Sequence, residues 1–178
     1  GYKRCNLTWD MVSKRNVSER PVSAAMWNVI RIANRTLEHL DDITDCTKEE
    51  HDELTGYCYF YRAYAHFVLC RHFGGVPYLD HALTGEDEWD LPRESSRSTY
   101  EKAAKDLYKA YEYFEKIGKM RRDALPGQTG HLTSSELNLP SGCTALAFRA
   151  RALLYAASPL SNETNDPALW QAAAEAAA

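Results

Sequence analysis

The chain is 178 residues long, which suits one domain or a piece of a larger one. Hydrophobic residues make up 44% of it and charged residues 26%, which is typical of a soluble globular protein and excludes a disordered chain. A net charge of -4, with Lys and Arg scattered along the chain, gives no electrostatic reason to expect nucleic acid as a partner.

The chain divides into a short irregular segment and a long helical one. Residues 1–20 mix polar and aromatic groups without a sustained period, and we interpret them as an irregular lead-in. Residues 21–178 are expected to form one helical-repeat domain. The helical pattern from Leu169 to Ala178 stops without a Gly, Pro or Asn to end it, so we expect this domain to be truncated at its C-terminal end.

Two helices are predicted in the first part of the domain. Pro21 suits the first turn of a helix, and apolar residues recur at three- and four-residue steps from there to Leu40. Thr47 and Glu50 have the spacing of a capping box, which predicts a second helix that runs to Phe73. Because the link between the two helices is short, we expect an antiparallel hairpin.

The second helix is the most distinctive element of the sequence. Its part from Tyr57 to Phe73 is rich in aromatic residues, yet Arg and His interrupt the apolar run before it reaches the roughly 18 residues of a membrane span. Ala63 and Ala65 leave room for the backbone of a neighbouring helix to come close. Gly74 and Gly75 end the helix. These features are typical of stacked helical hairpins.

The third predicted helix follows a long loop over residues 77–97. Ser98 and Glu101 have the spacing of a second capping box and predict where this helix begins. Apolar residues then follow on one side, and Gly118 is expected to close the helix.

Two further helices complete the prediction. A second long loop over residues 119–141 leads into an Ala-rich helix at residues 143–158, which Pro159 ends. Asp166 and Pro167 are expected to cap and start a fifth helix. No alternating pattern persists long enough to predict a strand. The predicted fold class is all-α, with tetratricopeptide-like helical hairpins that form an α/α superhelix.

The residues that usually carry catalysis or bind cofactors show no suitable spacing. The five cysteines contain no CxxC pair, and we expect most of them to be reduced, buried and inert. The six histidines form no HExxH motif, and no nucleophile elbow or Gly-rich phosphate loop is present. The sequence therefore predicts no enzymatic activity, no cofactor and no metal site.

Several short motifs occur in an order that resembles one known family, the SusD/RagB family. Their order and spacing match from about Trp27 to Trp170. The motifs are Ala25-Met26-Trp27-Asn28, Ile32-Ala33-Asn34, Arg62-Ala63-Tyr64, Phe73-Gly74-Gly75-Val76-Pro77, Leu91-Pro92-Arg93-Glu94-Ser95, Tyr100–Ala110 with Asp106-Leu107, and Ala145–Pro159. The chain departs from the family at residues 139–144, where members usually carry a basic turn, and it is much shorter than family members.

The resemblance implies both a fold and a function. Members of this family are surface glycan-binding lipoproteins of Bacteroidetes, built on four tetratricopeptide-like hairpins. By resemblance, the protein would bind an oligosaccharide at the cell surface without catalysis. It would sit on the outer membrane and deliver nutrient to a TonB-dependent SusC-like porin. Its contact with the membrane would depend on a lipid anchor that is missing from this chain.

Aromatic residues outside the helices are the best candidates for binding a sugar, because flat sugar faces stack on aromatic rings. Trp9 lies in the irregular lead-in with Asp10, Arg15 and Asn16 nearby to bind hydroxyl groups. Trp89 lies in the long loop. In the family, glycan contacts come partly from the segment before the Trp-Asn helix, which favours Trp9.

Aromatic and basic residues within the helices are interpreted as structural. We expect Tyr61, Trp27 and Trp170 to be packing residues. Arg62 and Arg149 lie in aromatic or Ala-rich helices, where an Arg usually pairs with a buried acid or caps a neighbouring helix.

Two other functions stay open. A tetratricopeptide-type scaffold for binding a protein partner would require a basic or carboxylate-clamp groove and no exposed aromatic platform. An α/α-barrel glycosidase or lyase would require paired carboxylates at a cleft, and the acids between Glu86 and Asp90 are its only support.

Overall fold

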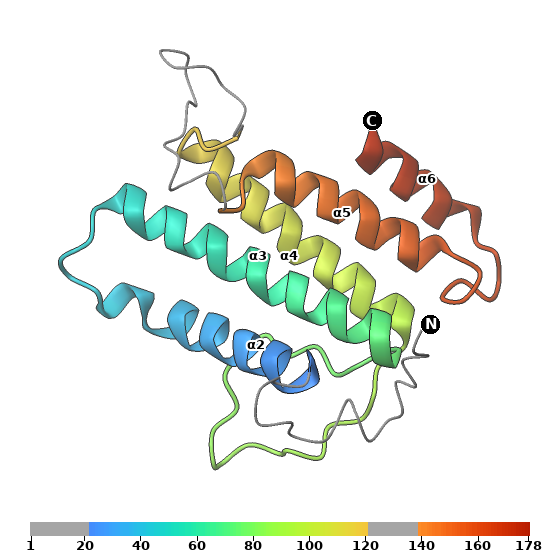
Figure 1. Ribbon diagram of the computed structural model, residues 1–178, viewed down its shortest axis with the longest axis horizontal. Helices are drawn as coiled ribbons and strands as arrows, with labels where there is room; N and C mark the ends of the chain where they lie inside the picture. The colour runs from blue at the N-terminus through green and yellow to red at the C-terminus, as the bar shows by residue number, and fades with distance from the viewer. Residues whose placement is uncertain (1–21, 121–138) are drawn as a thin grey trace, which may run out of the picture.

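The computed structural model describes residues 22–120 and 139–178, and this part of the chain contains α-helices and no strand. Consecutive helices pack on each other, and α3 also contacts α5. From α2 to α5 they run in alternating directions (Figure 1). The all-α array of hairpins is thereby confirmed. Its elements are α2 (Val22–His39), the single 3₁₀ turn η1 (Leu40–Asp42), α3 (Lys48–Phe73), α4 (Ser96–Lys116), α5 (Gly142–Ala157) and α6 (Pro167–Ala177).

Side-chain caps start two of the helices where the sequence predicts. The Thr47 hydroxyl accepts a hydrogen bond from the Glu50 backbone N–H, and the Glu50 carboxylate accepts one from the Thr47 N–H at 2.8 Å, so α3 begins with a complete capping box. At α6, the Asp166 side chain caps the Ala168 N–H and Pro167 occupies the first turn.

The start of α4 differs from the prediction by one turn. The N-cap is Ser95, whose hydroxyl accepts a hydrogen bond from the Ser98 N–H at 3.0 Å. Ser98 does not cap the helix because its own hydroxyl donates to the Glu94 carboxylate. The predicted end is confirmed: Gly118 has a φ of 72°, and the next N–H, that of Lys119, donates to the Phe114 carbonyl in a Schellman arrangement.

The main core lies where α3, α4 and α5 meet. Phe67, Leu107 and Phe114 are almost completely buried there. Ala63 belongs to this core, whereas Ala65 lies in a second cluster with Ile30 of α2. Both alanines are fully buried, so the predicted close packing at these positions is confirmed, and the two clusters show that it occurs on two sides of α3.

Two aromatic residues that were predicted to be packing residues are more exposed than expected. Tyr61 is 38% exposed, and its ring lies against Tyr57 and Phe60 of its own helix. Trp170 is 39% exposed because α6 packs through Leu169 instead.

The described cysteines form no disulfide. Cys58 and Cys70 are buried, and burial raises the pKa of each thiol. Cys46 is half-buried and Cys143 is exposed, so the expected burial holds for two of these four.

The predicted lead-in at residues 1–20 and most of the loop at residues 119–141 lie outside the described residues. The division into a lead-in and a helical domain therefore stays a prediction.

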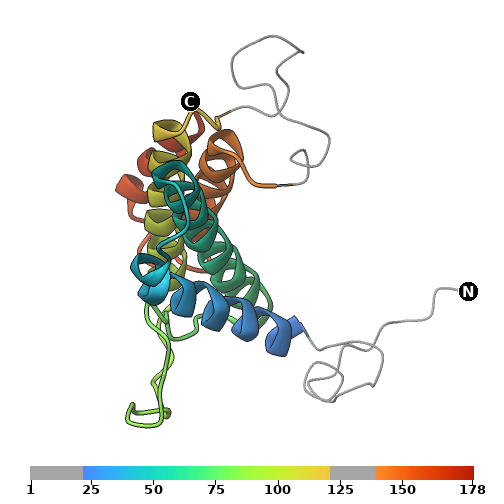
Figure 2. The ribbon, with the colours of Figure 1, turned by 90° about the vertical axis from the view of Figure 1, so that its left-hand side faces the viewer.

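A long connection between α3 and α4 positions the candidate site. It leaves α3 at Gly74, which has a φ of 76°, and projects beyond α2 and α3 before it returns to α4 (Figures 1 and 2). At Gly75 the chain passes so close to its own return that an added Cβ would lie 2.0 Å from the Glu94 carbonyl oxygen. The Arg93 side chain fixes this crossing by donating to the Gly75 carbonyl.

Candidate functional site

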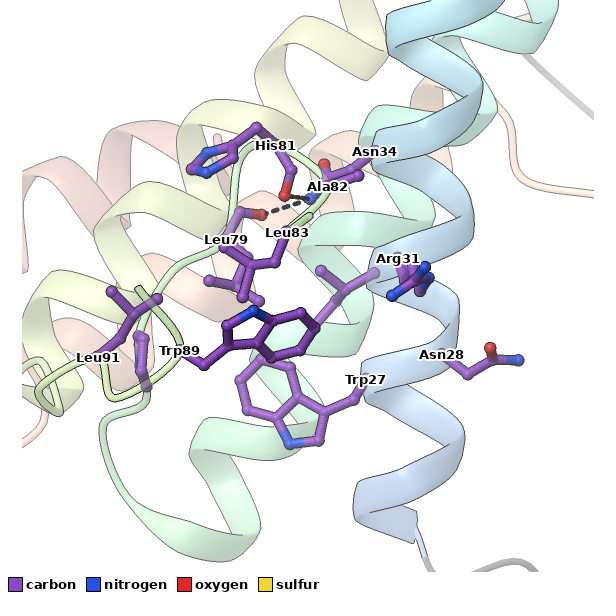
Figure 3. Close-up of a pocket in the computed structure, with 12 residues that line it drawn as sticks. Trp27, Asn28, Arg31, Asn34, Leu79, His81, Ala82, Leu83, Trp89 and Leu91 are labelled. Carbon is purple, nitrogen blue, oxygen red and sulfur yellow. Dashed lines mark hydrogen bonds between the residues drawn. The ribbon is translucent and has the colours of Figure 1, made fainter. Parts of the chain in front are cut away.

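A pocket lies between α2 and the connection from Pro77 to Leu91 (Figure 3). Its volume of about 470 Å³ falls within the range of roughly 300–1,000 Å³ that is usual for small-ligand sites. The lining residues are Trp27, Asn28, Ile30, Arg31, Asn34, Pro77, Leu79, His81, Ala82, Leu83, Trp89 and Leu91. Apolar residues dominate this list, and no carboxylate occurs in it.

Two indole rings from different elements enter this pocket. Trp89 comes from the connection and is 60% exposed, more than any other Trp, Tyr or Phe in the described ranges. Trp27 projects from α2 and is half-buried, with its ring edge against His66. Figure 3 shows the two rings extending into the pocket from opposite walls. Together they provide flat apolar surface that a ligand can contact.

A compact turn presents Trp89. The Asp87 carboxylate accepts hydrogen bonds from both the N–H and the hydroxyl of Thr84, each at 2.7 Å. Both bonds lower the pKa of Asp87, and the bond from the Thr84 backbone N–H has the larger effect. The indole N–H of Trp89 donates to the Thr84 carbonyl at 2.9 Å. The indole N–H is thus satisfied within the turn, and the ring faces are left for contact.

The inner wall of the pocket is an extended segment that buried side chains hold in place. The Asn34 amide donates to the Leu79 carbonyl at 3.1 Å and to the His81 carbonyl at 2.8 Å. Arg62 donates to the Asp80 carbonyl between them at 2.9 Å. Three successive carbonyl groups therefore find partners on α2 and α3 rather than on another strand.

His66 supplies a further bond to the same segment. Its Nδ1–H donates to the Arg62 carbonyl, and its Nε2 accepts the Leu79 N–H at 3.0 Å, so this pair of bonds requires the neutral ring. Burial, the largest influence, lowers the pKa of His66 to about 4. The Tyr78 ring stacks on the imidazole at a centroid distance of 3.8 Å.

A buried ion pair anchors this network to α4. Arg62 donates through Nε and Nη2 to both carboxylate oxygens of Asp106, at 2.7 and 2.9 Å. Burial acts to lower the pKa of Arg62, but the hydrogen bonds and charge of Asp106 outweigh it and raise the net pKa. The Tyr78 hydroxyl also donates to Asp106. The structural role predicted for Arg62 is confirmed. Arg149 instead places its guanidinium over the Tyr108 ring.

Polar groups occur at the rim of the pocket. His81 bonds to the Asp80 carboxylate at 3.0 Å, and this bond raises the pKa of His81. Asn28 and Arg31 line the pocket from α2, and both are exposed. Such groups can donate and accept hydrogen bonds at the pocket wall.

The structure tests only part of the predicted site. Trp9, Asp10, Arg15 and Asn16 lie outside the described residues, so their role in binding a glycan stays a prediction. Trp89 lies in the pocket.

The sequence analysis missed the contribution of two residues on α2. Trp27 does pack, as predicted, but it also lines the pocket. Asn34 is a polar residue on the apolar side of a helix, and this was the signal that it binds a neighbouring backbone.

Neither a group of metal ligands nor a helix that could span a membrane is present in the described ranges, 22–120 and 139–178. No group of three or more His, Cys, Asp or Glu residues there is arranged to hold a metal ion. None of the helices in these ranges is both long enough and apolar enough to cross a membrane.

Comparison with known proteins identifies the family. Residues 2–119 match the model of a SusD-like family that is described as "Starch-binding associating with outer membrane". Because this match covers well over half of the chain, the protein belongs to the SusD-like family, as the motifs predicted. A search among curated proteins finds no match.

Solved structures of SusD-like proteins have the same fold. A SusD-like protein from Bacteroides fragilis is 27% identical, with a TM-score of 0.60 over 84% of this chain and 27% of its own. A SusD-like carbohydrate binding protein from Bacteroides vulgatus is 16% identical, with a TM-score of 0.54 over 85% of this chain and 31% of its own. The chain thus spans about a third or less of the length of these relatives.

Proposed function

We propose that this protein binds an oligosaccharide without transforming it, and that the pocket between α2 and the connection contributes to the binding site. The observation that carries the proposal is the exposed Trp89 ring, which lines the same largely apolar pocket as Trp27. A sugar ring has one face rich in C–H groups that packs on an indole, while its hydroxyl groups need polar partners such as Asn28 and His81.

The descriptions of similar proteins also support this proposal. The matched family is described as starch-binding, and the relative from Bacteroides vulgatus as a carbohydrate binding protein. We further propose that the protein is a surface-exposed lipoprotein of the outer membrane. In this proposal it passes its ligand to a SusC-like TonB-dependent transporter, which is the partner that the family resemblance implies.

A binding measurement with matched tryptophan variants tests the sugar site. We expect the full-length protein to bind at least one member of a glycan panel in calorimetry or affinity electrophoresis. Trp89→Ala should weaken that binding about tenfold or more, since an aromatic contact of this kind contributes on the order of 1–3 kcal/mol. Trp170→Ala is the control, because Trp170 is also an exposed tryptophan with its indole N–H bonded locally, but it lies on α6 and does not line the pocket.

Equal losses in the two variants would contradict a site at Trp89. Failure to bind any glycan, together with tight binding of a peptide, would sink the sugar proposal as a whole.

The tetratricopeptide-type scaffold keeps one supporting observation. A groove of about 580 Å³ between α4 and α5 is lined by Lys105, Lys109 and Arg149, together with two glutamates, Glu101 and Glu112. This is a groove of the basic kind that the alternative requires. The exposed Trp89 is the feature that the same alternative does not predict, so sugar binding remains the better supported function.

The glycosidase or lyase alternative loses support. None of the acids from Glu86 to Asp90 lines the pocket. The carboxylates of Asp87 and Glu88 bond to groups of their own turn, namely Thr84 and the Asp90 N–H. A glycosidase needs two carboxyl groups across the sugar, and the described walls of this pocket supply none.

A further inference from the structure

Arg31 occupies an unusual place in the described part of the molecule. It lies one turn after Trp27 on α2 and carries the one permanent charge among the described residues that line the pocket. Its side chain is exposed, and within residues 22–120 and 139–178 no hydrogen bond, ion pair or aromatic ring engages it. By contrast, Arg62 on α3 and Arg97 on α4 pair with carboxylates. A guanidinium without a partner at a ligand pocket keeps all of its donors available.

The described wall of the pocket carries Arg31 as its one permanent charge and includes no carboxylate. The chain contains 25 Asp and Glu residues, yet none is among the pocket's described lining residues. Two carboxylates bond to residues of the pocket wall: Glu38 accepts the Ala82 N–H at 2.7 Å, and Asp80 pairs with His81. An anionic ligand would therefore meet a cation in the pocket wall and no carboxylate there.

We propose that the pocket selects acidic oligosaccharides, with Arg31 binding the carboxylate of a uronic-acid unit whose ring lies against the Trp27 and Trp89 indoles. A guanidinium presents parallel N–H donors that match the two oxygens of a carboxylate, which a neutral hydroxymethyl group cannot reproduce. Asn28, one turn from Arg31 on α2, also lines the pocket. This inference rests on the proposed sugar-binding function and specifies its substrate class.

The test compares acidic glycans with neutral forms of the same backbone. The full-length protein is titrated with oligogalacturonate, oligomannuronate and glucuronate-bearing xylo-oligosaccharide, each beside its methyl-esterified form. Esterification removes the charge and leaves the sugar rings unchanged. We expect at least one acid form to bind about tenfold more tightly than its ester, equivalent to about 1.4 kcal/mol. Because Arg31 is exposed, this preference should shrink at high salt.

Two variants assign the preference to Arg31. Arg31→Gln should bring the acid form to the affinity of the ester and leave the ester unaffected. Arg31→Lys should keep part of the preference, because the charge remains and the paired donors are lost. The matched control is Arg35→Gln: Arg35 is also exposed on α2, one turn further on, but it does not line the pocket. This control should retain the full preference.

The outcomes separate the two proposals. If neutral glycans bind in a Trp89-dependent manner and no acid form binds better than its ester, the acidic substrate class is overturned while sugar binding stands. An acid preference that survives Arg31→Gln, or disappears equally in Arg35→Gln, also overturns the role of Arg31. If no glycan binds at all, the proposed function fails and this inference fails with it.

Discussion

The two faces of the pocket's inner wall differ sharply in how they are held. On the inner face of the segment from Tyr78 to Ala82, backbone groups bond to the buried side chains of Asn34 on α2 and of His66 and Arg62 on α3. On the outer face, the same segment and the Trp89 turn line an open pocket. The backbone groups on the inner face have hydrogen-bond partners within the protein, whereas the outer face is open to a ligand.

The difference teaches where stability and binding reside in this molecule. Irregular backbone can serve as a rigid wall when side chains satisfy it, because orphaned buried N–H and carbonyl groups would otherwise be costly. Substitutions on the inner face should therefore change the free energy of unfolding. Substitutions on the outer face, such as those at Trp89 and Arg31, should change affinity and leave stability nearly unaltered.

The largest expected effect comes from removing Arg62. Arg62→Met should lower the free energy of unfolding by about 3–5 kcal/mol, because it leaves the Asp106 carboxylate buried without its partner. The measurement is the urea midpoint at constant m-value. The double variant Arg62→Met with Asp106→Leu is the control, since it removes both charges and should recover much of the loss.

A small loss in Arg62→Met, equal to that of the double variant, would show that the pair contributes little. The comparison of the two faces would then rest on Asn34 and His66 alone.

The next effect is a dependence of stability on pH that arises from His66. Its pKa is lowered from about 6.5 to about 4 in the folded protein, so between these values the unfolded chain binds a proton that the native chain does not. Stability should therefore fall as the pH drops through this window, by about 3 kcal/mol in total, and this loss should level off below it. The measurement is urea unfolding at a series of pH values.

The variant His66→Gln separates this dependence from that of other groups. Carboxylates with lowered pKa values, such as Asp80 and Glu94, titrate in both proteins and cancel in the difference. His81 acts in the opposite direction, because its raised pKa contributes stability at low pH that is lost as the pH rises, but this exposed pair contributes little. Identical pH profiles for the two proteins would contradict the assignment to His66.

The helices were predictable because local signals specify them. The capping box at Thr47 and the Asp166-Pro167 start are satisfied by residues within one turn, and the structure confirms both. The predicted start of α4 was wrong because Ser95 and Ser98 both suit an N-cap. The choice between them depends on Glu94, which binds the Ser98 hydroxyl.

The pocket was not predictable from sequence spacing. Trp27 and Trp89 are far apart in the chain and meet only because the connection between α3 and α4 returns past α2. Local patterns identified Trp89 as a residue outside the helices, yet they could not show which surface it faces. The inner wall is likewise made by contacts such as Asn34 to His81, whose positions differ by 47 in the sequence.

The smallest expected effect concerns Gly75, where the outgoing and returning parts of the connection between α3 and α4 cross. Gly75→Ala should lower the free energy of unfolding by about 1–3 kcal/mol, because the new methyl group would lie 2.0 Å from the Glu94 carbonyl oxygen and backbone would have to move. The urea midpoint measures the loss. Gly85→Ala is the matched control: it lies in the same connection with nothing within 4 Å of an added Cβ, and its midpoint should change by less than about 0.5 kcal/mol.

The position of Gly75 also links the two faces. The carbonyl of Glu94 belongs to the part of the connection that returns to α4, and the Glu94 side chain accepts a hydrogen bond from the Tyr78 N–H at 3.1 Å. Movement at this crossing should therefore reach the inner wall, so Gly75→Ala should weaken glycan binding as well as folding. A variant with lower stability but unaltered affinity would show that the crossing supports the scaffold alone, and that the pocket wall is fixed by Asn34, Arg62 and His66.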